Sequence, residues 1–205
     1  MSRRIGITGN IGAGKTTVCR QFEQLGIPVY YADVRAKELM YTNQALSANI
    51  RREFGEESYL PDGKLNREHL ARVAFGDPSA LELLNSLVHP AVAEDALRWH
   101  RAQTDVPYTL HEAAILLEIG GAAAYDAMVV VSCPLEIRRN RVMARDGIDA
   151  EAFSQRTARQ WTDERKEAAA DYLIVNDGRH LLLPQVLRLD RILREPTAPK
   201  SRNGR

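Results

Sequence analysis

The chain has 205 residues, of which 44% are hydrophobic and 27% are charged, and its formal net charge is +1. This length suits one α/β domain with an insertion, and the near-neutral charge gives no global attraction to nucleic acid or to an anionic membrane. Membrane-spanning proteins are disfavoured too, because the longest apolar run, residues 127–131, is only long enough for a buried strand.

The first predicted element is a strand that leads into a complete phosphate-binding loop. Residues 3–8 form a short, mostly apolar run, residues 9–16 match G-x-x-x-x-G-K-[ST], and residues 17–25 show helical spacing. Such a loop points backbone N–H groups at phosphate oxygens, its lysine approaches the β- and γ-phosphates, and its threonine ligates Mg²⁺. The expected nucleotide contacts are Gly12, Ala13, Gly14, Lys15, Thr16 and Thr17, with Thr16 as the metal ligand.

Two other interpretations of this loop are weaker. A chance match to the pattern is expected in roughly 1% of chains of this length at average residue usage. The dinucleotide-binding pattern G-x-G-x-x-G needs a third glycine where Thr17 stands, so that fold is disfavoured. The loop therefore predicts nucleotide binding.

Five apolar runs alternate with helical stretches, which predicts a parallel α/β sheet with helices on both faces. About 75 residues without a convincing strand separate the second and third runs, and this segment shows helical patterns with a break at His89-Pro90. We expect a helical subdomain over about 34–104 that holds a second substrate. The apolar runs are residues 5–8, 28–31, 108–111, 128–132 and 172–175.

Asp33 follows the second apolar run and opens a helix. The carboxyl ends of the strands are the edge where α/β sheets bind ligands, so this carboxylate could act as a general base for an acceptor hydroxyl. Aspartate is also a preferred helix N-cap. From position alone, the N-cap interpretation is the more favoured of the two.

An arginine cluster lies in a helical stretch after the fourth apolar run. Arg138, Arg141 and Arg145 are three and four residues apart, which places them on one helix face. Glu136 is the only acidic residue in this stretch, so we expect a face that salt bridges do not balance. One interpretation is a solvated basic face. The other is a mobile lid over about 135–165 whose arginines neutralise a transferring phosphoryl group.

Three further polar residues keep structural and functional interpretations open. His89 alone is more typical of a helix start than of a ligand. Glu118 closes an apolar stretch and is either a substrate contact or a helix-end charge. Asn176 begins an Asn-Asp-Gly turn after the last strand, and that loop could also border a purine.

The ends of the chain and its cysteines complete the expectations from composition. Residues 1–4 lead directly into a strand without the apolar segment of a signal peptide. Cys19 and Cys133 lack metal-site or C-x-x-C spacing, so we expect reduced core residues and a cytoplasmic protein. Residues 196–205 are polar and rich in chain breakers, which predicts a disordered tail after a single domain over 1–195.

Taken together, these motifs resemble the dephospho-coenzyme A kinase family from about residue 5 to residue 193. Two departures stand out: Tyr31 replaces the first aspartate of the family's Asp-Ala-Asp motif, and Asn10 replaces a common glycine. The similar segments are the strand and loop at 5–17, Ala32-Asp33, a Gly-x-Leu-x-Arg segment at 63–67, a His-Pro motif at 87–90, an apolar run ending in glutamate at 115–118, and the series Arg138 to Arg145, Gln160, Ala170-Asp171 and Asn176.

The resemblance implies a P-loop kinase that transfers the γ-phosphoryl group of ATP to the ribose 3′-hydroxyl of dephospho-CoA, with Mg²⁺. It implies that Asp33 is the base, that the insertion with His89 holds the acceptor, and that Lys15 and the lid arginines, Arg141 among them, stabilise phosphoryl charge. Glu118 is then an acceptor contact and Asn176 a nucleotide contact. The implied partners are small molecules, with no nucleic acid and no membrane.

Two alternatives remain open. The nearer one is another small-molecule P-loop kinase, which would act on a nucleoside or a nucleoside monophosphate. The more distant one is a GTP-binding switch, a class that reads guanine with Asn-Lys-x-Asp, and this tetrapeptide does not occur in the sequence.

Overall fold

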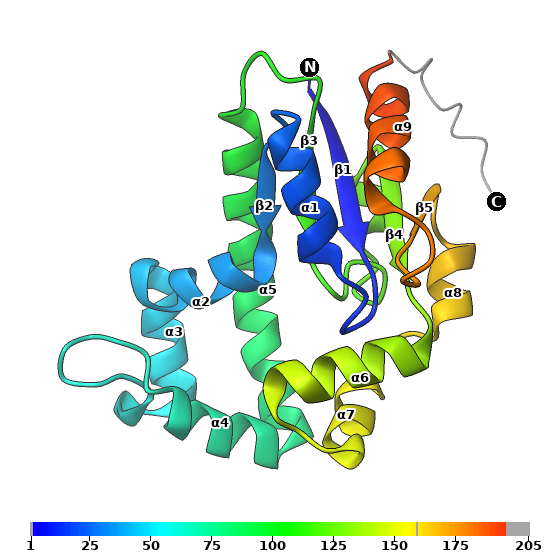
Figure 1. Cartoon of the computed structure of the whole chain (residues 1–205). Helices are drawn as coiled ribbons and strands as arrows, with labels where there is room; N and C mark the ends of the chain where they lie inside the picture. Colours follow the sequence, from blue (N-terminus) through cyan, green and yellow to red (C-terminus); the bar gives the residue numbers. More distant parts are fainter. Residues whose placement is uncertain (1, 159, 196–205) are drawn as a thin grey trace. The chain divides into compact units, whose positions relative to one another are not determined.

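The computed structural model describes residues 2–158 and 160–195, and it contains a five-stranded parallel sheet flanked by helices (Figure 1). The order of strands is β2-β3-β1-β4-β5, so the strand that precedes the phosphate loop is central. The predicted α/β class with five strands is confirmed. The strands are β1 (Arg3–Thr8), β2 (Val29–Tyr31), β3 (Tyr108–Glu112), β4 (Ala127–Ser132) and β5 (Tyr172–Val175).

The chain forms two compact units. The first, which we call the sheet unit, comprises the described residues up to Val29 and from Gln103 onward. The second, the helical unit, comprises Tyr30–Ala102. A single domain over 1–195 remains a prediction, and the tail over 196–205 lies outside the described residues.

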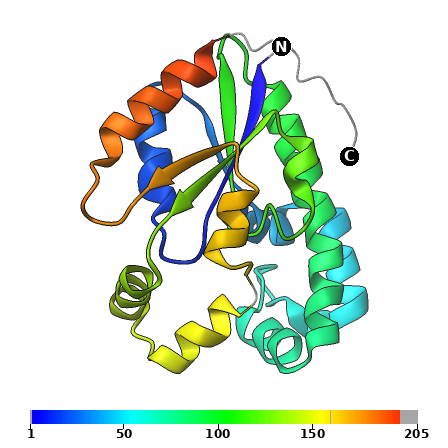
Figure 2. The same ribbon diagram turned by 90° about the vertical axis from the view of Figure 1, so that its right-hand side faces the viewer.

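Two helices of the sheet unit lie together on one face of the sheet. Helix α1 (Lys15–Gln24) packs against α9 (Leu182–Arg194), and these helices also contact β3 and β5 respectively (Figures 1 and 2). Helix α8 (Asp163–Ala168) contacts β4. The remaining elements of this unit are η2 (Gly121–Ala124), α6 (Leu135–Asp146) and α7 (Ala150–Thr157).

Residues 127–131 of β4 are all apolar and all buried, so both faces of the sheet are covered at this strand. Ile5 and Ile7 of β1 and Val129 of β4 have no exposed surface, and the predicted buried strand at 127–131 is confirmed. Cys19 and Cys133 are both free and buried, as expected from their surroundings. The helices of residues 2–158 and 160–195 lack the uninterrupted apolar length that crossing a bilayer requires.

A buried aspartate fastens α9 to the sheet unit. The Tyr108 hydroxyl donates to Oδ1 of Asp190 at 2.7 Å, and Nε of Arg194 donates to Oδ2 at 2.8 Å. Arg194 also donates to the carbonyl of Leu25 at 3.1 Å, next to the end of α1. Burial and the Asp190 carboxylate raise the pKa of Tyr108 well above its usual range, so the phenol stays a donor. The last described helix is thereby tied to β3 and α1.

The helical unit has its own core. Its elements enclose an apolar cluster in which Ile50 is fully buried and Tyr59 donates a hydrogen bond to the carbonyl of Met40. Tyr59 also lies under the guanidinium of Arg51, whose carbon is 4.2 Å from the ring centre. The elements are α2 (Ala32–Thr42), α3 (Gln44–Phe54), η1 (Glu56–Ser58), α4 (Arg67–Gly76) and α5 (Pro78–Arg101).

The expected helix break at His89-Pro90 is wrong. Helix α5 continues through Pro90 without interruption. A proline removes one backbone hydrogen bond and crowds the preceding turn. Side chains on both sides of it nevertheless pack against the same apolar cluster, and this shared burial keeps the two halves in one helix. These side chains are Leu84, Leu87 and Val88 before the proline, and Ala91 and Val92 after it.

Candidate functional site

The phosphate loop connects β1 to α1, and its glycines are required by its geometry. Gly12 and Gly14 have φ angles of 82° and 90°, which residues with a side chain rarely adopt. A Cβ atom on Gly12 would lie 2.7 Å from the carbonyl oxygen of Arg138, and one on Gly14 would lie 2.2 Å from Nδ2 of Asn176. The loop is therefore closely packed between two neighbouring segments of the sheet unit.

Lys15, the first residue of α1, lies beside a glutamate that the sequence analysis did not select. Its ammonium donates to the carbonyl of Gly9 at 3.0 Å and is 3.8 Å from Oε1 of Glu112. Glu112 is the last residue of β3 and is paired with Ile7 of β1, so it reaches the edge where the loop begins. The predicted strand ended one residue too early. The argument applied to Asp33, a carboxylate at a strand's carboxyl end, would have found Glu112 as well.

The residues around Lys15 suit a magnesium ion that also binds phosphate. Thr16 is exposed in the first turn of α1, and the Glu112 carboxylate lies beside the loop. Among the described residues, no group of three or more His, Cys, Asp or Glu side chains could hold a metal by itself. Mg²⁺ in phosphotransfer sites takes one or two protein ligands and completes its shell with water and phosphates. The donor set of Thr16 and Glu112 fits that pattern.

Asn176 and Arg141 meet next to the phosphate loop. Nδ2 of Asn176 donates to the carbonyl of Ala13 at 2.8 Å, and its backbone N–H donates to Ser132 at 2.8 Å. The two Nη atoms of Arg141 lie 3.4 Å from the backbone and side-chain oxygens of Asn176, and Nη1 lies 3.4 Å from Sγ of Cys133. Two predicted site residues, distant in sequence, thus lie at the same edge of the sheet.

Arg138 lies inside the protein and not on an exposed helix face. Only 3% of its surface is accessible. Its guanidinium donates to Asp163 at 2.5 Å and to the carbonyls of Cys133 and Ile11 at 3.0 and 3.3 Å. The bond to Ile11 holds the backbone of the phosphate loop, so Arg138 stabilises the conformation of the loop.

The expectation of an unbalanced arginine face is wrong. Asp163 pairs with Arg138, and Asp146 pairs with Arg145 at 2.7 Å and with Arg156 at 2.6 Å. Asp146 directly follows the stretch in which Glu136 is the only acid, whereas Asp163 belongs to α8 and reaches Arg138 through the fold. Hydrogen bonding from Arg145 lowers the pKa of Asp146 to about 2. Of the three arginines predicted to share one helix face, Arg138, Arg141 and Arg145, only Arg141 has no carboxylate partner among the described residues.

The segment that follows α7 binds the phosphate loop through two hydrogen-bonded side chains. Oε1 of Gln160 accepts from the N–H of Ile11 at 2.9 Å. Nδ2 of Asn10 donates to the Trp161 carbonyl at 3.1 Å and to Oδ1 of Asp163 at 2.6 Å. Asn10, which departs from the family pattern, therefore joins the loop to the start of α8.

Glu118 belongs to a buried ion pair. It lies in the turn after β3, where Oε1 accepts from Lys166 at 2.8 Å and from the N–H of Trp161 at 2.9 Å. Lys166 also donates to the Ala114 carbonyl at 2.7 Å, and burial lowers its pKa. The helix-end interpretation of Glu118 is wrong, because the residue is not at a helix end. Its other oxygen, Oε2, is buried without a hydrogen-bond partner in the described structure.

Asp33 and His89 belong to the helical unit. The N-cap position of α2 is Tyr31, and the exposed Asp33 is the second helical residue, so the N-cap interpretation is wrong. An acid in the first turn still interacts favourably with the helix dipole. His89 is half-buried in α5, and burial lowers its pKa, which keeps the imidazole neutral at pH 7.

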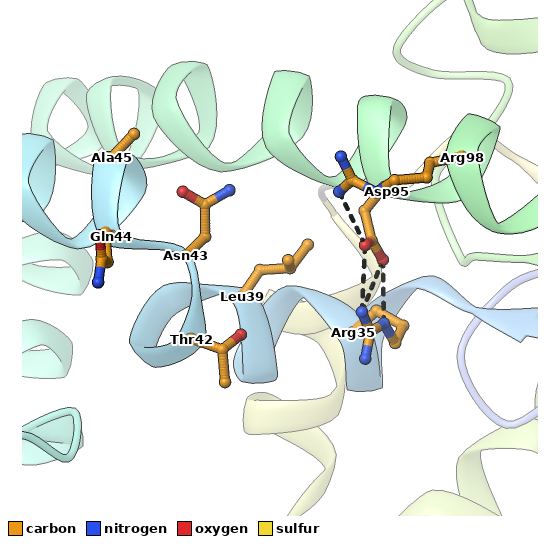
Figure 3. A pocket seen from close by; sticks show the side chains of 8 residues that line it. All are labelled: Arg35, Leu39, Thr42, Asn43, Gln44, Ala45, Asp95 and Arg98. Carbon is orange, nitrogen blue, oxygen red and sulfur yellow. Dashed lines mark hydrogen bonds and ion pairs between the residues drawn. The ribbon is translucent and has the colours of Figure 1, made fainter.

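The helical unit also contains a cavity of about 490 Å³, which is lined by Arg35, Asp95 and Arg98 among others (Figure 3).

Known proteins resemble the chain over most of its length. A model of the family described as dephospho-CoA kinase matches residues 3–181. A dephospho-CoA kinase from Bacteroides fragilis is 36% identical over 189 residues, which cover 92% of each chain. One from Salinibacter ruber is 40% identical over 176 residues, covering 85% of this chain and 88% of the relative.

Solved structures agree with this result. A protein from Thermus thermophilus aligns with a TM-score of 0.78 and 33% identity over 96% of this chain and 99% of its own. Dephospho-CoA kinase from Campylobacter jejuni aligns with a TM-score of 0.69 and 23% identity over 93% of this chain and 96% of its own, which supports the fold. From the phosphate loop to the last strand, the chain belongs to the dephospho-CoA kinase family.

Proposed function

We propose that the protein transfers the γ-phosphoryl group of ATP to the ribose 3′-hydroxyl of dephospho-CoA and so produces coenzyme A. The observation that carries this choice of acceptor is the match of residues 3–181 to the dephospho-CoA kinase family. A nucleoside or nucleoside monophosphate kinase would share the phosphate loop, but family membership argues against that alternative.

The phosphate loop would bind the ATP phosphates. Backbone N–H groups and the start of α1 provide positive potential, and Lys15 adds a charge that can act on the transferring phosphoryl group. Arg141 would add a second charge. Its contacts at Asn176 and Cys133 are long and involve no carboxylate, so a phosphate oxygen would be a stronger partner than its present ones. Asn176 would keep the loop in its binding conformation through Ala13.

Asp33 would orient the acceptor hydroxyl and accept its proton. The residue is exposed at the start of α2, directly after β2, where it can meet a substrate. His89 would contact the acceptor as a neutral hydrogen-bonding group, in keeping with its lowered pKa. Glu118 would contact the acceptor as well, and its Oε2, which has no hydrogen-bond partner in the described structure, would be the atom to accept a hydrogen bond once it is uncovered.

Thr16 and Glu112 are the residues that would hold Mg²⁺. When bound, this ion neutralises charge on the β- and γ-phosphate oxygens. A cytoplasmic location, which fits two free buried cysteines, is part of the same proposal.

The test is ADP release, measured in a coupled assay with MgATP and a panel of acceptors. Dephospho-CoA should give the highest kcat/KM, while adenosine and AMP should give little turnover above the rate without acceptor. The product should match authentic coenzyme A in mass and in its phosphorus NMR spectrum, which reports the 3′ position. A preference for adenosine or AMP would instead establish a nucleoside or nucleotide kinase.

A further inference from the structure

Three side chains of the helical unit converge on one buried carboxylate. Asp95 in α5 is 7% exposed, and its Oδ2 accepts from the Tyr30 hydroxyl at 2.8 Å. Arg35 donates to both oxygens, from Nε at 3.0 Å and from Nη2 at 3.1 Å. Arg98 donates to Oδ1 at 3.2 Å from the neighbouring turn of α5. Figure 3 shows Arg35 and Arg98 reaching Asp95 from two different helices.

Two of these donors flank Asp33 in the chain. Tyr30 belongs to β2, and Arg35 lies in the first half of α2, so both sides of the strand-to-helix junction are tied to one carboxylate. Tyr30 is fixed further by the ring of Trp99, with 5.4 Å between ring centroids. Within the described structure, the N-cap residue Tyr31 makes no side-chain capping bond to α2. The anchors to α5 therefore supply the constraint that a cap would otherwise give.

We propose that Asp95 is a positioning residue, which holds the β2–α2 junction so that the Asp33 carboxylate is set for proton transfer. The inference rests on the proposed function, in which Asp33 is the general base. Asp95 itself does not serve as the base, since it is buried and its oxygens already accept hydrogen bonds from Tyr30, Arg35 and Arg98. A base displaced by about 1 Å can lose on the order of 10²-fold in rate.

The alternative role for Asp95 is stability alone, and the chain contains a matched control for it. Asp190 in α9 is 9% exposed and also accepts from a tyrosine, Tyr108 at 2.7 Å, and from an arginine, Arg194 at 2.8 Å. It belongs to the sheet unit and is not adjacent in sequence to any proposed site residue. Asp190→Asn thus measures the effect of weakening a buried Tyr–Asp–Arg cluster without disturbing α2.

The experiment compares Asp95→Asn, Asp190→Asn, Asp33→Asn and the double variant Asp33→Asn/Asp95→Asn. Thermal unfolding, KM for ATP and kcat at saturating MgATP and dephospho-CoA are measured for each variant, with kcat expressed per folded enzyme. We expect Asp95→Asn to lower kcat about tenfold or more with KM for ATP unchanged. Asp190→Asn should lower the Tm and keep kcat.

The double variant separates positioning from independent effects. If Asp95 acts through Asp33, adding Asp95→Asn to Asp33→Asn should lower kcat no further, because the base is already gone. Losses that multiply would overturn the proposal, and so would equal kcat for Asp95→Asn and Asp190→Asn. Should Asp95→Asn fail to fold, Tyr30→Phe is the second variant. It removes the hydroxyl that donates to Asp95 at 2.8 Å and lies 3.4 Å from the Val92 carbonyl, and it should show a smaller loss of kcat with the same dependence on Asp33.

Failure of the proposed function has a separate signature. Full activity of Asp33→Asn would show that Asp33 is not the base, and the proposed positioning role of Asp95 would then be wrong as well. A large loss in Asp33→Asn, combined with unchanged kcat in Asp95→Asn and Tyr30→Phe, would overturn the positioning role alone.

Discussion

The ammonium of Lys15 lies 3.8 Å from a carboxylate oxygen of Glu112, and both side chains are nearly buried, with 11% and 7% of their surfaces exposed. The separation is longer than that of a hydrogen-bonded ion pair, so Glu112 attracts Lys15 to the loop without fixing its ammonium. The Lys15 ammonium is therefore held at the loop by its hydrogen bond to the Gly9 carbonyl and by this weaker attraction to Glu112.

Lys15→Ala should leave the fold intact and lower kcat on the order of 10²–10³-fold. The reason is that the lost charge would act mainly on the transferring phosphoryl group. Thermal unfolding and turnover at saturating MgATP check both parts. Lys37→Ala, a change at an exposed lysine of α2, is the control and should behave like the wild type. Near-normal turnover of Lys15→Ala would contradict the role of this loop.

Glu112→Gln should raise the Mg²⁺ concentration needed for half-maximal activity and lower kcat. The amide keeps the shape of the side chain but loses the charge that would hold a cation beside Lys15. A magnesium titration at fixed ATP measures the shift, and Glu151→Gln on the exposed side of α7 is the control. An unchanged magnesium dependence would show that Glu112 serves only to place Lys15.

Arg141→Lys should lower kcat strongly, whereas Arg139→Lys should be nearly silent. Lysine cannot reproduce the planar pair of donors that arginine presents to a phosphoryl group. Arg139, by contrast, pairs with Glu136 at the surface, where such ion pairs contribute little. Steady-state kinetics of both variants decide the matter. Small, equal effects of the two changes would contradict a role for Arg141 in phosphoryl transfer.

Asp33→Asn should reduce kcat on the order of 10²–10⁴-fold, the usual contribution of a positioned general base. The exposed side chain is not a cap, so the free energy of unfolding should change by less than about 1 kcal/mol through the helix dipole alone. ATP affinity should persist, because the phosphate loop is unchanged. Turnover, unfolding and ATP binding should be measured on one preparation of the variant. Full activity would exclude Asp33 as the base.

His111 should make stability depend on pH. Burial, with a smaller effect of Arg4, lowers the pKa of His111 to about 4, below its ordinary value of 6.5. The unfolded chain therefore binds more protons between these values, and the stability present above about pH 6.5 is lost as the pH falls toward 4. The loss amounts to at most about 3 kcal/mol. Urea unfolding at pH 7 and pH 5 measures it, and His111→Gln should show a smaller difference between the two.

The sequence predicted the elements whose signals are local. Five strands, the phosphate loop and the helices of the insertion follow from apolar spacing and glycine positions, and all five strands are present. Pro90 misled the prediction because a local rule was outweighed by burial on both sides of the proline.

The partners of charged residues were not predictable in the same way. Arg138 finds Asp163 and Ile11 only through the fold, and the pairing of Lys15 with Glu112 depends on the register of β1 and β3. Spacing along one helix cannot show that one arginine is buried while Arg145 is exposed. Contacts of this kind connect segments that are distant in sequence, so no pattern within a single segment contains them.

The contact between Asn176 and Ala13 joins residues that are 163 positions apart. The amide that braces the loop therefore leaves the ribosome after nearly all of the sheet has been synthesised. An N-terminal fragment can contain the whole G-x-x-x-x-G-K-T sequence and still lack this brace. The loop is therefore braced only in a chain that has been synthesised through its last strand.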